Sequence, residues 1–222
     1  MAKVAGGVAT VALASTLLAA CGGSSPTTTS TTPPSSTTTT TVLHSQPPTA
    51  MWPYYGGVAR YYTGAAAARG FAAGMLGMVD PTVGTYHGQS STAGYVDVAP
   101  SAVATPTRVR VSLINGSWWA TSASTADIAV TSPTSMQLIT SPVALRGSAV
   151  AFEGVVNVSL YIDGGSVPVS RTTVMGGGDV MRPFTGSMKF SAGHATYGTI
   201  IFYTKSMKDG STALGEAFRI KY

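Results

Sequence analysis

The sequence predicts a mainly β protein that has a β-sandwich over residues 127–222, a small α+β domain over residues 50–125, and a disordered N-terminal stalk. Three observations predict this organisation. Residues 127–222 contain six short apolar stretches separated by turn residues, whereas only residues 65–78 repeat with a helical period. Every residue from 24 to 41 is Ser, Thr or Pro. Short strands at regular spacing are typical of a two-sheet sandwich, and a tract without apolar groups has nothing to bury.

The bulk composition supports one folded part and excludes one class of partner. Hydrophobic residues make up 44% of the 222-residue chain, which is ample for a core. The formal charge is +5, with eight acidic residues and no Lys/Arg cluster. A nucleic-acid surface needs a basic stripe, so we expect no nucleic-acid partner and scattered solvating charge.

Residues 1–20 have the form of a secretory leader. Lys3 precedes an apolar stretch from residue 4 to 18, which is shorter and more polar than the ~20 apolar residues of a transmembrane helix. Residues 18–21, Leu-Ala-Ala-Cys, resemble the lipobox of bacterial lipoproteins. The resemblance implies that residues 1–20 are a signal peptide and that Cys21, the only cysteine, becomes the acylated N-terminus, with fatty acids such as palmitate. The alternative is a secreted protein in which Cys21 is a free or buried thiol.

Residues 21–49 then form the predicted Ser/Thr/Pro-rich tether. Its 28 residues after Cys21 would reach roughly 90 Å if extended at ~3.1 Å per residue. Such a stalk would lift a folded head off the extracytoplasmic face of the cell membrane.

Residues 50–125 are expected to fold as one helix on a small antiparallel sheet. Ala68, Phe71, Met75 and Met78 are spaced by three, four and three residues, which predicts the buried face of a helix ending at Asp80-Pro81. Strand-like sequences follow near residue 95 and over residues 107–122. Residues 115–116, Asn-Gly, divide the second of these sequences and predict a tight hairpin.

Residues 127–222 contain the expected strands of the sandwich. Val156, Val158, Leu160 and Ile162 alternate with more polar residues, which predicts one buried face, and a turn follows at residues 163–165. The six predicted strand sequences are DIAVTSP, SPVALRGSAV, VVNVSLYIDGG, MKFSAGH, TIIFYTKS and EAFRIKY.

This part of the chain resembles the immunoglobulin-like domain of bacterial spore germination, the second Gmad type. The residues that carry the resemblance are Gly147, Phe152-Glu153-Gly154, Pro183-Phe184 and Lys208-Asp209-Gly210. The resemblance implies an extracytoplasmic immunoglobulin-like β-sandwich that mediates interactions and brings no catalytic residues. Residues 65–123 resemble the small α+β region that precedes this domain in such lipoproteins. No second germination-type domain is found, so the family name does not by itself predict a role in germination.

The sequence predicts no catalytic, cofactor-binding or metal-binding residues. The histidines are His44, His87 and His194, and no Gly-x-Ser-x-Gly stretch supplies a nucleophile. Residues 174–183 contain three consecutive glycines, but they lack the Gly-Lys-Ser/Thr ending of a phosphate loop and are expected to be a mobile inter-strand loop. Glu153 is expected to be a partly buried structural carboxylate beside a buried Phe152.

Trp118 and Trp119 are the candidate contact residues. Successive residues of a strand point to opposite faces, so one ring should enter the core and the other should be more exposed. Exposed aromatic residues are enriched where proteins bind. The alternative is that these rings, with the aromatic residues near residue 52, seal the junction between the two domains.

Together these observations predict a non-enzymatic, lipid-anchored protein of the cell envelope, which binds or scaffolds outside the cytoplasmic membrane. Its partner would be another envelope protein or a cell-wall polymer. The alternatives from other classes are an accessory protein that binds cell-wall glycan and a divergent hydrolase.

Overall fold

The computed structural model describes residues 46–54 and 60–222, which all belong to one compact unit. The proposed signal peptide, Cys21 and the stalk as far as residue 45 lie outside the described residues. Within the described part of the chain the fold is mainly β, as predicted, and no helix is long and apolar enough to cross a membrane.

The predicted helix is present, but it is shorter than expected. It consists of α1 (Gly64–Phe71) and a π-helical continuation, η1 (Ala72–Leu76). The hydroxyl of Thr63 caps its start by accepting a hydrogen bond from the Ala66 N–H at 3.1 Å. The helix ends before the predicted Asp80-Pro81 because Gly77 adopts a left-handed conformation, with φ 76°. All four residues of the predicted face are buried.

Four antiparallel strands follow the helix in sequence order and form a meander. Residues Asn115 and Gly116 both have positive φ, 51° and 76°, which is the geometry of the tight hairpin that their sequence predicted. The strands are β1 (Thr82–Gly88), β2 (Ala93–Ala99), β3 (Thr107–Ile114) and β4 (Ser117–Thr125).

Seven further strands follow. They are β5 (Ile128–Ser132), β6 (Val143–Ala149), β7 (Val155–Ile162), β8 (Ser170–Met175), β9 (Arg182–Met188), β10 (Tyr197–Lys205) and β11 (Thr212–Lys221). The sequence did not predict β8, and it placed the strand before β10 at residues 188–194, which overlap β9 only at its last residue, Met188. Strand β9 contains Pro183, which lacks a backbone N–H; β9 tolerates it because it pairs with β6 alone.

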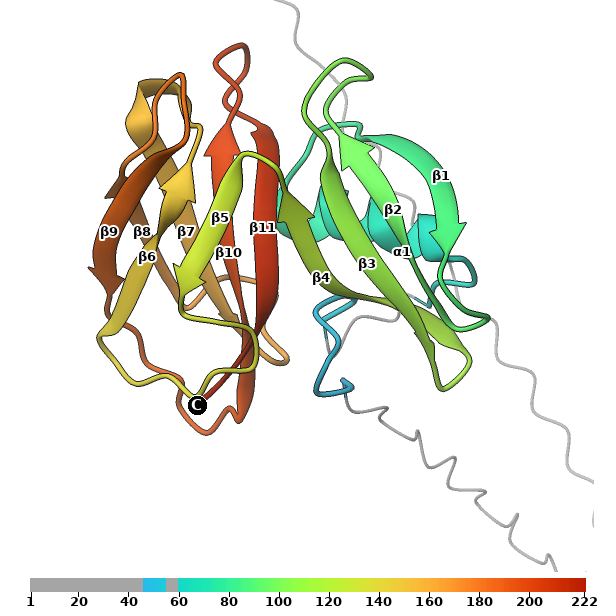
Figure 1. Ribbon diagram of the computed structural model, residues 1–222. Coiled ribbons are helices and arrows are strands. Elements are labelled where there is room, and N and C mark those ends of the chain that lie inside the picture. Colours follow the sequence, from blue (N-terminus) through green and yellow to red (C-terminus); the bar gives the residue numbers. More distant parts are fainter. Residues whose placement is uncertain (1–45, 55–59) are drawn as a thin grey trace, which may run out of the picture. The chain divides into compact units, whose positions relative to one another are not determined.

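The pairing of these seven strands confirms the immunoglobulin-like sandwich. One sheet has the order β8-β7-β10-β11, and the facing sheet has the order β5-β6-β9 (Figure 1). In immunoglobulin terms β5, β6 and β9 take the positions of strands A, B and E, while β7, β10 and β11 take those of C, F and G. Strand β8 extends the sheet of β7, β10 and β11 and lies beside β7, which has the position of strand C.

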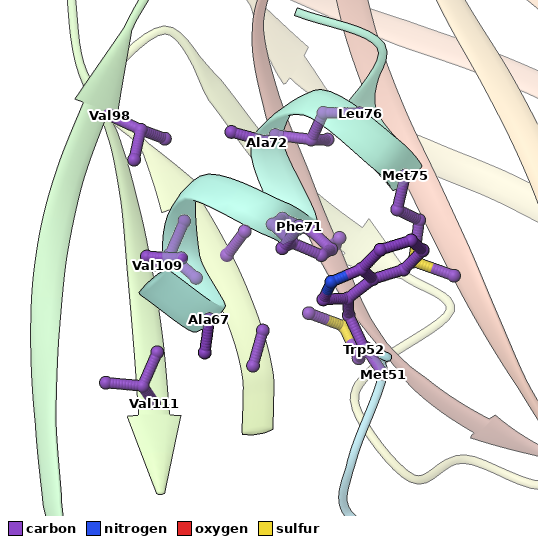
Figure 2. Packing of buried hydrophobic residues seen from close by; sticks show 14 of the residues in the cluster. Met51, Trp52, Ala67, Phe71, Ala72, Met75, Leu76, Val98, Val109 and Val111 are labelled. Carbon is purple, nitrogen blue, oxygen red and sulfur yellow. The ribbon is translucent and has the colours of Figure 1, made fainter. Parts of the chain in front are cut away.

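The meander and the sandwich share one continuous sheet, because β4 lies beside β11 with Ala123 opposite Ala217. One hydrophobic cluster lies between the helix and this sheet and includes Ile201 and Ala217 (Figure 2). A second cluster fills the sandwich and includes Phe218 from the other face of β11. The division into separate domains at residues 50–125 and 127–222 remains a prediction.

Trp52 belongs to the first cluster and lies against two glycines of the helix. Its indole N–H donates to the Tyr61 hydroxyl at 3.0 Å. A Cβ at Gly70 would overlap the Tyr61 hydroxyl, and a Cβ at Gly74 would overlap the Trp52 ring. The two glycines therefore provide the groove into which these aromatic side chains fit; Figure 2 shows Trp52 beside Phe71 and Met75.

A buried arginine connects the two ends of the described unit. Arg219 on β11 is 2% exposed and makes two short bonds to the Asp163 carboxylate, at 2.6 and 2.7 Å. Its Nε also donates to the backbone oxygen of Pro48 at 2.9 Å. A buried guanidinium needs a paired charge and satisfied donors, and this arrangement supplies both.

Candidate binding surface

Three loops meet at one end of the sandwich, and we call this surface the loop end. It comprises residues 150–154 between β6 and β7, residues 175–181 from the last residue of β8 to the start of β9, and residues 206–211 between β10 and β11, at the top of Figure 1. Strand β8 has the position of strand C′ in immunoglobulin terms. The three loops are therefore the B–C loop, the loop that leaves C′, and the F–G loop. The loops at this end bind antigen in antibody variable domains.

Apolar side chains are unusually exposed at the loop end. Phe152 is 55% exposed, Met175 66% and Met207 67%. Two hollows meet at Phe152: one of about 740 Å³ is shared with Met175, and one of about 350 Å³ is shared with Met207. Val180 and Met181 are also exposed. A contiguous exposed apolar patch marks an interaction site more often than scattered apolar residues do.

The exposure of Phe152 corrects the sequence-based expectation that it is buried. Glu153 has φ 56° and ψ 10°, and Gly154 follows with φ 69°, so two successive residues are left-handed. This turn directs the chain into β7 while the side chains of Phe152 and Glu153 stay outside. Glu153 is therefore exposed, not partly buried as expected.

A left-handed conformation at a non-glycine residue costs roughly 1–2 kcal/mol, and such strain concentrates where a side chain must be presented. At Glu153 the strain coincides with the exposed Phe152.

The glycine run at residues 176–178 holds two of the loops together. It connects β8 to β9, as expected of an inter-strand loop, but its backbone is hydrogen-bonded to the neighbouring loop, whereas a mobile loop was expected. The Gly176 N–H donates to the Gly154 oxygen at 2.8 Å, and the Ala151 N–H donates to the Gly178 oxygen at 3.1 Å. At Gly177, with φ 93°, a Cβ would lie 2.8 Å from the backbone oxygen of Ala149. Only glycine allows this approach, so the run brings one loop backbone directly onto the other.

The third loop is ordered by the carboxylate of Asp209. It accepts hydrogen bonds from the hydroxyl and the N–H of Ser211, at 2.7 and 3.0 Å. The Ser211 hydroxyl is the main cause that holds the pKa of Asp209 below its usual value, so the carboxylate keeps its charge. The turn therefore presents Met207 from a defined backbone.

The predicted contact residues Trp118 and Trp119 lie elsewhere, near the start of β4. Trp118 packs against the first cluster and meets Tyr86 edge to face, with ring centroids 5.4 Å apart. Trp119 pairs with Ser112 on the opposite face of the sheet, and its indole N–H donates to the Ile114 oxygen at 3.3 Å. Both rings are partly buried. The structure does not bring them to the loop end, and their role as a contact surface remains a prediction.

The face that carries Trp119 also holds a stacked polar row. His87 stacks on Tyr95 with ring centroids 4.8 Å apart, and the guanidinium of Arg108 lies 4.1 Å from the Tyr95 centroid. Arg108 binds both oxygens of Asp97, at 2.9 and 3.0 Å. The stacking contacts and the ion pair between these groups fix their positions on the sheet.

The other chemistry-bearing residues are dispersed. His194 is exposed in the turn before β10, far along the chain from His87 on β1, and His44 lies outside the described residues. Over residues 46–54 and 60–222 no group of three His, Cys, Asp or Glu side chains could hold a metal ion.

Sequence reasoning missed the residues that define the loop end. Met175 directly precedes the glycine run, and Met207 lies inside a turn between Ser206 and Lys208. An apolar residue within a predicted turn could have indicated an exposed apolar side chain, because turns lie at the surface.

Comparison with known proteins supports the assignment of the sandwich. Residues 127–211 match the family model of the immunoglobulin-like domain of bacterial spore germination, Gmad2. The match confirms the resemblance that the sequence motifs indicated. No curated protein and no solved structure matches the chain.

Proposed function

We propose that the protein is a non-catalytic binding module of the cell envelope, anchored by lipid at Cys21, and that its loop end docks a protein partner. The immunoglobulin-like domain supports a binding or accessory role. The lipobox-like residues 18–21 and the Ser/Thr/Pro tract support the anchor and the stalk. A diacylglycerol with its two chains anchors a protein stably, whereas one chain binds only marginally.

The observation that carries the proposal is the apolar cluster of Phe152, Met175 and Met207 on loops that are fixed by backbone hydrogen bonds. Methionine and phenylalanine are enriched in the cores of protein interfaces. Apolar side chains on a fixed backbone lose little freedom on binding, which favours affinity. The partner therefore presents an apolar segment that fills the hollows on both sides of Phe152.

Photo-cross-linking in intact cells tests the docking surface. A benzophenone amino acid placed at residue 152, 175 or 207 should give the same discrete cross-linked protein band. The matched controls are Ala144 and Thr185, exposed residues of β6 and β9 away from the loops. The combined variant Phe152→Ser, Met175→Ser and Met207→Ser should lose co-purification of that protein and keep the circular dichroism spectrum of the wild type.

Equal cross-linking at the control positions, or none at the loop end, would overturn the docking proposal. Pelleting with purified cell-wall sacculi in place of a protein band would favour the glycan-binding alternative. Intact mass of the N-terminal peptide from the membrane fraction tests the anchor: an unmodified Cys21 contradicts it.

A further inference from the structure

A third hollow lies between the end of η1 and the face of β7, β8 and β10 that η1 leaves open, and it adjoins the 206–211 loop through Gly210 and Ser211. Its volume is about 290 Å³, close to the lower end of the range for small-molecule sites, ~300 Å³. The side chains that matter to its chemistry are Arg171, Lys205, Tyr161, Tyr203 and Ser159.

Strand register explains why these side chains meet. Arg171 of β8 lies opposite Ser159 of β7, and Ser159 lies opposite Ile201 of β10. Tyr161 and Tyr203 follow two residues along their strands and therefore point to the same face. This face forms the floor of the hollow.

The helix forms one wall of the hollow. The carbonyl of Leu76 accepts a hydrogen bond from the Thr212 hydroxyl at 2.5 Å, which fixes the end of η1 against β11. Gly74 of η1 and Gly77, which directly follows η1, also line the hollow, so main-chain atoms of the helix end are accessible to a ligand.

The charges of the hollow have one sign. Its lining includes two cations, Arg171 and Lys205, and no acidic residue. Within the described residues neither cation forms an ion pair. Arg171 and Tyr161 both line the hollow; burial raises the pKa of Tyr161, and the charge of Arg171 offsets part of that rise.

These features favour a ligand that has an anionic group at one end and hydroxyl groups at the other. The cations favour a carboxylate or a phosphate. A bare anion is disfavoured at the opposite wall, because the C-terminal end of a helix carries partial negative charge and free carbonyl acceptors. Hydroxyl groups suit that wall, and the accessible lining of the hollow is mostly polar, which favours a ligand that carries several hydroxyl groups, such as a sugar.

We propose that this hollow binds a single anionic sugar unit, with its carboxylate or phosphate at Arg171 and Lys205 and its hydroxyls at the end of η1. The site shares Lys205 with the smaller hollow of the loop end, but Phe152, Met175 and Met207 do not line it, so the two proposals can fail separately.

Titration calorimetry on the full chain in detergent tests the site with four probes: glucuronate, glucose 6-phosphate, glucose and inorganic phosphate. At least one of the two sugar acids should bind about tenfold more tightly than glucose or phosphate alone, the gain expected from adding a charge-assisted contact to the sugar contacts. The double variant Arg171→Gln and Lys205→Gln should lose that preference.

The matched control is Arg146→Gln with Lys189→Gln, which removes the same charge from two exposed cations that lie outside the hollow. Tyr203→Leu provides an independent variant that leaves both cations in place and should weaken the sugar acid more than phosphate. Phosphate binding as tightly as both sugar acids, an equal effect of the control variant, or no binding by any probe would each overturn the proposal.

Discussion

Glu216 is a half-buried acidic residue of β11. One of its carboxylate oxygens accepts a hydrogen bond from the Val130 N–H of β5 at 3.2 Å. Burial raises the pKa of Glu216 from its ordinary value of 4.5 to about 7, and the Val130 hydrogen bond offsets only part of this effect. The folded protein therefore keeps the proton between pH 4.5 and 7, where the unfolded chain releases it.

Because the pKa is higher in the folded state, this group lowers the free energy of unfolding as the pH rises from 4.5 to 7. Glu216→Gln keeps an acceptor for Val130 and removes the titration. We expect the variant to exceed the wild type in stability by ~1–2 kcal/mol at pH 8, a figure reduced for the partial exposure of the group, and to match it near pH 4.5. Urea unfolding at both pH values provides the measurement. Glu153→Gln, at an exposed acid, serves as the control, and an unchanged pH dependence in Glu216→Gln would contradict the argument.

At the scale of the element, the helix depends on the absence of a side chain at Gly74. A methyl group there would overlap the ring of Trp52, which is held by its hydrogen bond to Tyr61. Although alanine favours helix formation, overpacking of this kind costs typically ~1–3 kcal/mol, so we expect Gly74→Ala to destabilise the protein.

Trp52→Phe provides the matched test, because the smaller ring leaves room for the methyl group. In a double-mutant cycle, Gly74→Ala should cost less in the Trp52→Phe background than in the wild type. The same cost in both backgrounds would show that the ring is not the cause.

The elements that local patterns define were predictable from the sequence. The buried face from Ala68 to Met78 and the Asn115-Gly116 hairpin depend on residues close in the chain, and both are present. Strand β8 was missed because Val174 is the only fully buried residue of its six. Strand β9 was misplaced because Pro183 and Gly186 are typical of a loop, and only the pairing with β6 makes them a strand.

The loop end could not be predicted from any one segment. Phe152, Met175 and Met207 come together only because three loops leave the same end of the sandwich. The exposure of Phe152 also depends on the left-handed backbone at Glu153, which favours Gly, Asn or Asp and is not signalled by a glutamate. Sequence alternation did predict that Trp118 and Trp119 point to opposite faces, since that signal is local, but it did not say that Trp118 is the one that packs against the core.

For the whole molecule, β11 is the strand on which both hydrophobic clusters depend. Ala217 belongs to the cluster under the helix, whereas Phe218 and Ile220 belong to the cluster inside the sandwich. The buried hydroxyl of Thr107 on β3 accepts a hydrogen bond from the Gly215 N–H at 3.1 Å. Loss of β11 therefore exposes apolar surface in both clusters at once.

We accordingly expect residues 46–222 to unfold in one cooperative transition within the full chain. Of the three tryptophans, Trp52 and Trp118 report on the first cluster and Trp119 on the opposite face of the same sheet, and the methyl group of Ile200 reports on the second cluster. In urea, tryptophan fluorescence and the Ile200 methyl signal should have the same midpoint. Two separate midpoints would show that the predicted domains fold independently.

The position of Pro48 has a mechanical consequence. Tension on the chain from its N-terminal side first reaches the Arg219–Pro48 bond and the hydrogen bonds of Met51 and Trp52 to Ala120 on β4. These contacts connect the point of entry to the two central strands of the shared sheet, not to an edge. A load transmitted along a membrane tether would thus spread over the middle of the fold, and the loop end would keep its shape while the head is pulled.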